Sequence, residues 1–127
     1  MPKSVVGEVV LEFGKFWQWL QGHPNCIVSV ATPEAVLYDH DDFHWHLGKE
    51  GQDTLLVQVL RGKDLVGEVL IASGTVTYVE IDGKGPEEFV FDCIVEADDG
   101  PYSAYSFTLS HGYDPAEQPE SPGRWVH

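Results

Sequence analysis

The stretch that decides the fold is residues 88–111, EFVFDCIVEADDGPYSAYSFTLSH. In its first half every second side chain is apolar, at Phe89, Phe91, Cys93, Val95 and Ala97, and the acids that alternate with them are Glu88, Asp92 and Glu96. Its second half repeats this period at Tyr105, Phe107, Leu109 and His111. A period of two is typical of strands with one buried face and one face in water. Because only the turn residues 98–101 separate the halves, we predict an antiparallel hairpin.

Shorter runs of strand-forming residues precede this hairpin. They cover residues 26–31, 35–38, 43–47, 54–60, 65–72 and 75–81, and segments rich in Gly, Pro and Asp separate them. Short turns of this composition join neighbouring strands in antiparallel order. We therefore predict a mainly antiparallel sheet.

The N-terminal part follows a different period. Apolar residues recur at helical spacing, at Val6, Val9, Val10, Phe13, Trp17 and Leu20. Ser4 is a suitable N-cap, and Gly22 with Pro24 is a suitable stop. The pattern predicts one amphipathic helix from Val5 to Gln21.

The predicted fold class is therefore α+β. One N-terminal amphipathic helix packs on a curved, mainly antiparallel sheet, and a partly closed barrel is the alternative. We expect residues 1–113 to form a single domain and residues 114–127 to be an irregular C-terminal tail. The core should contain Phe13, Trp17, Phe91, Cys93 and Phe107.

Composition limits the classes of function. The 127 residues are 43% hydrophobic, and 21 acids against 7 bases give a net charge of −14. Such a charge repels nucleic acid and anionic membrane and favours basic partners. We find neither a signal peptide nor a membrane span, and interpret Cys26 and Cys93 as reduced thiols, so we predict a cytoplasmic location.

Histidines gather in residues 39–46, DHDDFHWH. On an extended strand, His44 and His46 point to the same side. Imidazole and carboxylate ligands suit Zn²⁺, Fe²⁺ or Mn²⁺, and either Glu50 or His111 could complete the site. Alternatively, His44 and His46 belong to a strand face in contact with water, and Trp45 lies on the opposite, buried face.

The spacing of His44, His46 and Glu50 resembles the first motif of the cupin family, in which His-x-His is followed by Glu. The resemblance covers fewer than 20 residues. The glycines of that motif are not in register, and no Pro-x-Gly precedes His111 as the second motif would require. The resemblance implies a small metal-dependent enzyme or sensor that binds a divalent transition metal.

Two features predict a binding surface instead. The acids Glu88, Asp92 and Glu96 should form a stripe on one sheet face, which suits a basic protein. Trp19 lies nearly opposite the apolar stripe of the helix, so we expect it either to be exposed and available to a partner or to be covered by Trp125 of the tail.

No catalytic constellation is complete, so we favour a non-enzymatic binding module. It would use the acidic sheet face, or a pocket between helix and sheet that takes a small apolar ligand. The alternative function is the cupin-like metal site.

Overall fold

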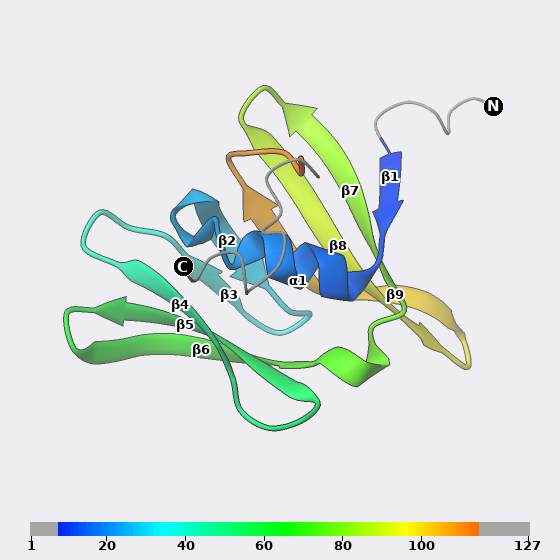
Figure 1. Cartoon of the computed structure of the whole chain (residues 1–127), viewed down its shortest axis with the longest axis horizontal. Helices are drawn as coiled ribbons and strands as arrows, with labels where there is room; N and C mark the ends of the chain where they lie inside the picture. The colour runs from blue at the N-terminus through cyan, green and yellow to red at the C-terminus, as the bar shows by residue number, and fades with distance from the viewer. Residues whose placement is uncertain (1–7, 115–127) are drawn as a thin grey trace, which may run out of the picture.

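The computed structural model describes residues 8–114, and within that range it contains one α-helix and nine strands in two sheets (Figure 1). Sheet A has the order β1-β7-β8-β9-β2-β3 and sheet B the order β4-β5-β6. The strands of sheet A are β1 (Glu8–Leu11), β2 (Ile27–Ala31), β3 (Val36–Tyr38), β7 (Tyr78–Gly85), β8 (Glu88–Ala97) and β9 (Gly100–Leu109). Those of sheet B are β4 (His44–Lys49), β5 (Thr54–Arg61) and β6 (Asp64–Ala72). The predicted antiparallel sheet is confirmed, but the two sheets do not close into a barrel.

Every strand pairing is antiparallel, as the short turns predicted. The β8–β9 hairpin pairs Phe91 with Phe107. The Leu/Val-rich residues 54–72 form β5 and β6, joined by a turn in which Gly62 has a φ of +63°. The 3-10 helices η2 (Pro24–Cys26) and η3 (Ser73–Thr75) lead into β2 and β7.

The predicted helix boundary is wrong at its N-terminal end. The helix α1 spans Phe13–Leu20, and the residues before it form the edge strand β1, paired with β7. Glu12, with φ −70° and ψ 142°, separates the two elements. Valine is a weak helix former and a good strand former, so pairing with the open edge of β7 prevails over the helical spacing. The predicted residues Ser4, Val5 and Val6 lie outside the described range.

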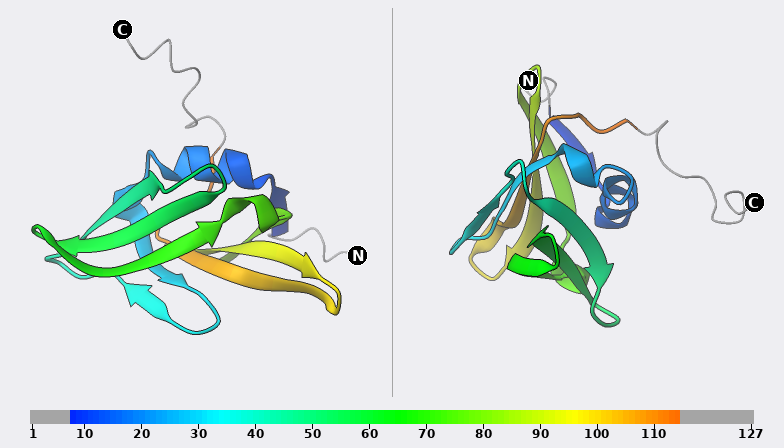
Figure 2. Two further views of the ribbon diagram at one scale, coloured as in Figure 1. Left: turned by 90° about the horizontal axis from the view of Figure 1, so that it is seen from below. Right: turned by 90° about the vertical axis from the view of Figure 1, so that its left-hand side faces the viewer.

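The hydrophobic core lies on the inner face of sheet A, which α1 and sheet B cover from the same side (Figure 2). All five predicted core residues are buried. The ring of Phe16 stacks on Phe91 at 5.1 Å between centroids and meets the edge of Phe107 at 5.2 Å. These aromatic contacts fix α1 against the β8–β9 hairpin.

Sheet A and sheet B approach each other closely at β3 and β6. A Cβ on Gly67 would lie 2.6 Å from Cδ2 of Leu37. Glycine therefore lets the β3 side chain lie directly on the β6 backbone. The two strands belong to different sheets, so this contact is one of packing between the sheets and not of strand pairing.

The predicted tail, residues 114–127, lies outside the described range except for Asp114. Among residues 8–114 no helix has the length and apolar character needed to cross a membrane.

Candidate functional site

The outer face of sheet A, on the side away from α1, carries a group of acids on β7 and β8. We call Glu80, Asp82, Glu88 and Asp92 the acidic face. The inner-facing neighbours of these acids on both strands, such as Val79, Ile81 and Phe91, are buried in the core. The register places Glu80 directly opposite Asp92. Like charges at directly opposed positions repel and destabilise a strand pair, so this arrangement lowers the stability of the isolated protein.

The basic side chain on this surface is Lys84, whose Nζ lies 2.9 Å from Oδ2 of Asp82. The pKa of Lys84 is raised, first by its hydrogen bond to Asp82 and by the charge of Asp82, and further by the charges of Asp92 and Glu88. Lys84 therefore experiences the negative potential of acids on both strands. The hydroxyl of Ser103 donates a 2.9 Å hydrogen bond to Asp92, which orients that carboxylate.

Two of the three acids predicted as a stripe, Glu88 and Asp92, thus lie near Glu80 and Asp82. Glu96 is exposed near the end of β8. Sequence reasoning did not place Glu80 on this surface, although the alternation of Glu80 with Val79 and Ile81 could have done so. The cross-strand register that sets Glu80 against Asp92 is a property of the fold.

The exposure predicted for Trp19 is wrong, because this side chain is fully buried. It stacks on His23 at 4.5 Å and on Phe91 at 5.5 Å between ring centroids, and Tyr113 meets it edge-on at 5.3 Å. The prediction failed because the chain after β9 covers the side of α1 that faces away from the predicted stripe. Trp19 is a core residue and is not available to a partner.

His44 and His46 are both exposed on β4, on either side of the buried Trp45. They share one strand face, as the period of two predicted. Nε2 of His46 lies 3.3 Å from the position of a Cβ on Gly48, so the imidazole leans along the strand. Both imidazoles are exposed on the face of β4 opposite Trp45.

The other two predicted ligands do not complete a shell around this pair. Glu50 is exposed in the turn after β4. His111 packs against His23 at 5.2 Å between ring centroids, and its Nδ1 lies 2.7 Å from the carbonyl oxygen of Gly112. Within residues 8–114, no three side chains of His, Cys, Asp or Glu are grouped so that they could hold a metal ion.

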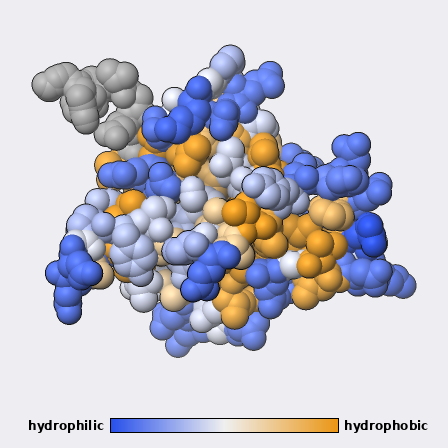
Figure 3. Space-filling view, turned by 180° about the vertical axis from the view of Figure 1, so that it is seen from behind, coloured by the Kyte–Doolittle hydropathy of each residue, from blue (hydrophilic) through white to orange (hydrophobic). Residues whose placement is uncertain are grey.

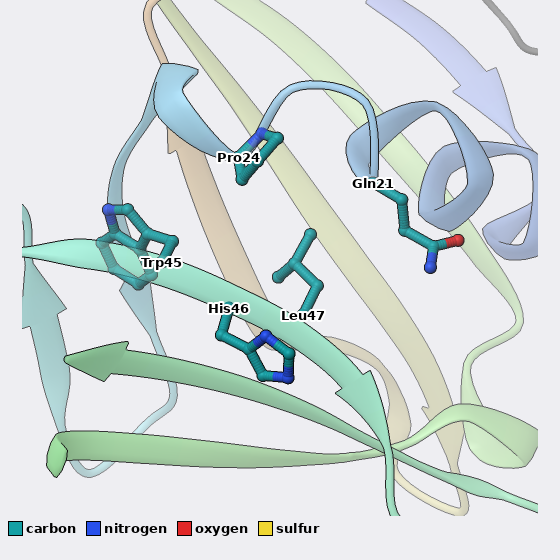
Figure 4. Close-up of a pocket in the computed structure, with 5 residues that line it drawn as sticks. All are labelled: Gln21, Pro24, Trp45, His46 and Leu47. Carbon is teal, nitrogen blue, oxygen red and sulfur yellow. The ribbon is translucent and has the colours of Figure 1, made fainter. Parts of the chain in front are cut away.

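A pocket of about 220 Å³ lies between the end of α1, η2 and β4. Gln21, Pro24, Trp45, His46 and Leu47 line it. Figure 4 shows Trp45 and Leu47 on the Pro24 side of β4, while His46 points away from them. Nε1 of Trp45 donates a 3.2 Å hydrogen bond to Oδ1 of Asp39, which holds the indole in place.

The two cysteines are free thiols. Burial raises the pKa of the Cys93 thiol well above its usual range, and the charge of Asp92 raises it further. A thiol that stays protonated is a poor nucleophile and a poor metal ligand. Cys93 is therefore a core residue on the inner face of β8.

The structure thus places four acids on one sheet face, whereas Glu50 and His111 do not join His44 and His46 and Trp19 is buried. The pocket lies beside β4, and its walls include one of the two exposed histidines. Comparison of the chain with known protein families, curated proteins and solved structures finds no match.

Proposed function

We propose that this protein is a non-enzymatic binding module whose acidic face binds a basic partner protein. The observation that carries the proposal is the pairing of Glu80 with Asp92 across β7 and β8. A basic partner would relieve the repulsion between these two carboxylates, and this relief makes the free energy of association more favourable.

The net charge supports the same proposal. A chain with a net charge of −14 attracts basic proteins at long range and so raises the association rate. Around the acidic face, Lys84 is already paired with Asp82 and neutralises only part of the charge. The remaining carboxylates can accept hydrogen bonds from arginine or lysine.

We expect the triple substitution Glu80→Gln, Glu88→Gln, Asp92→Asn on the acidic face to abolish salt-sensitive binding of basic proteins. The wild type should capture such partners from its own cell extract at low salt and release them at high salt, because screening weakens charge attraction. Removing three carboxylates should leave folding intact or improve it, since self-repulsion falls. The measurement is a capture experiment at two salt concentrations, with the bound proteins identified by mass.

The matched control is Glu12→Gln, Glu34→Gln, Glu50→Gln, which removes the same charge from exposed positions outside the acidic face. It should retain most of the binding. If the control loses binding as fully as the first variant, the attraction comes from net charge and the acidic face has no special role. A wild type that captures nothing salt-sensitive contradicts the proposal outright.

The pocket beside β4 is a weaker candidate for the binding site. Ligand pockets are typically about 300–1,000 Å³, and this one is about 220 Å³. Two of its five lining residues, Gln21 and His46, are polar, which does not suit a small apolar ligand. We therefore assign binding to the acidic face.

The metal-dependent alternative makes a separate prediction. Because only two imidazoles share the outer face of β4, we expect elemental analysis of tag-free protein, purified without chelator, to give far less than one transition metal per chain. The double substitution His44→Ala, His46→Ala should leave metal content and melting temperature unchanged, as should His40→Ala in the preceding loop. A stoichiometric metal that disappears only in the double variant would favour the cupin-like function instead.

A further inference from the structure

We infer that the basic partner of the acidic face binds through an amphipathic α-helix that lies along β9, on the outer face of sheet A. The inference rests on the proposed function and specifies the kind of partner. The strand register arranges the side chains of the outer face in rows. One row, from β1 to β3, consists of Val10, Glu80, Asp92, Ser106, Ala31 and Val36. Another, from β7 to β3, consists of Asp82, Val90, Thr108, Ser29 and Tyr38.

These two rows point away from the hydrophobic core. The row between them consists of Ile81, Phe91, Phe107, Val30 and Leu37, which belong to the core or pack against it. Because side chains alternate along a strand, the neighbours of this row point outward. On β3, Leu37 packs on Gly67 of the other sheet, so Val36 and Tyr38 lie on the outer face.

The outer face therefore presents two kinds of side chain on opposite sides of β9. The acidic face lies on β7 and β8. Val36 and Tyr38, which we call the apolar edge, lie on β3 and expose 44% and 66% of their surface. Between the two, β9 carries the short hydroxyl side chains of Ser106 and Thr108. Figure 3 looks onto this face from behind and shows orange, pale and blue side chains next to one another.

The spacing of the strands fits an α-helix. β7 and β3 are each the second strand from β9, on opposite sides of it. At about 4.8 Å between neighbouring strands, each lies about 10 Å from β9. A helix with its side chains is about 10–12 Å across. A helix that rests on Ser106 and Thr108 therefore has the acids along one side and the apolar edge along the other.

The chemistry of the two sides defines this helix. Lysine or arginine along one side would pair with the carboxylates, and leucine or aromatic residues along the other would bury the apolar edge. A partner with basic residues alone would leave Val36 and Tyr38 in water. A second copy of the chain does not fit, because it would bring another acidic face and another net charge of −14 to the same surface.

Two synthetic peptides test the inference. Both are about 20 residues long, which gives a helix of about 30 Å, close to the length of the 10-residue strand β9. Both carry the same lysines along one side, and the other side is leucine in the first peptide and alanine in its control. We expect the wild type to bind the lysine–leucine peptide about tenfold more tightly, because only leucine buries the apolar edge. Fluorescence anisotropy of the labelled peptides at low and high salt measures both affinities.

Variants of the two sides should change binding differently. Val36→Thr, Tyr38→Thr should bind the two peptides equally, since it removes the apolar edge and keeps every acid, while threonine retains a preference for strands. Glu80→Gln, Glu88→Gln, Asp92→Asn should weaken the binding of both peptides.

Val10→Thr is the matched control. Val10 is 62% exposed on the same outer face, at the far edge beyond the acids, so this variant should keep the tenfold preference. Equal binding of the two peptides by the wild type, or a preference that survives in Val36→Thr, Tyr38→Thr, overturns the inference and leaves the proposed function standing. If neither peptide binds in a salt-sensitive way, or the acidic-face variant binds both as the wild type does, the proposed function fails and the inference with it. A wild type of twice 14.1 kDa that becomes a monomer in Val36→Thr, Tyr38→Thr also overturns the inference, because a second copy would then cover the apolar edge.

Discussion

Replacing Phe91 with alanine is expected to lower the free energy of unfolding by about 3–5 kcal/mol. Phe91 is fully buried on β8, where it contacts Phe16 and Trp19 of α1 at 5.1 and 5.5 Å between ring centroids. Its loss leaves a cavity between helix and sheet that neither can close without moving the other. Because small domains are stable by about 5–15 kcal/mol, the variant should unfold at a much lower denaturant concentration.

Urea unfolding, followed by circular dichroism, measures this effect. Phe91→Leu keeps most of the volume and should cost about 1 kcal/mol. Val90→Ala, on the half-buried outer side of the same strand, should cost much less than Phe91→Ala. An unchanged midpoint for Phe91→Ala would mean that α1 does not pack against this face of sheet A.

Trp19→Ala should destabilise the protein by a similar amount, about 3–5 kcal/mol. An exposed tryptophan, as the helical spacing predicted, would change stability by no more than about 0.5 kcal/mol. The buried and the exposed placement of Trp19 therefore predict losses in the free energy of unfolding that differ several-fold. The buried placement also predicts a blue-shifted emission from this indole, which stacks on His23 and is met edge-on by Tyr113.

The matched control for Trp19 is Gln18→Ala, at the neighbouring exposed position of α1. We expect little change in its unfolding midpoint, because helix propensity rises slightly while only surface contacts are lost. If Trp19→Ala unfolds at the same midpoint as Gln18→Ala, the burial of Trp19 is wrong and its role as a partner contact is open again.

The N-terminal element shows how tertiary structure can prevail over a local pattern. Apolar spacing favoured one helix from Val5 to Gln21, yet residues 8–11 form β1. A helix of that length gains most of its stability from the surface on which it packs. The open edge of β7 offers hydrogen bonds to Val9 and Val10, residues that also prefer strands, and the helix begins only at Phe13.

The burial of Trp19 and the spatial grouping of the candidate metal ligands were beyond the sequence for a related reason. A helical wheel gives the direction of a side chain but not the elements that cover it, and residues 111–113 come from the far end of the chain. His44 and His46 share a face because of strand geometry alone, whereas a third ligand requires another element at the right distance. The sequence spacing of His44 and His46 does not determine the distance to a ligand on another element.

The sequence by itself determined the strands that follow α1, their antiparallel pairing, the buried face of β8 and the strong negative charge, because period-two alternation, turn residues and composition are local properties. Only the tertiary structure decided that the strands divide into two sheets and that Glu80 faces Asp92. It also decided that Leu37 of β3 packs on the backbone of Gly67 in β6. These features depend on cross-strand register and on the packing of distant segments, where the energy of each contact depends on two separate parts of the chain.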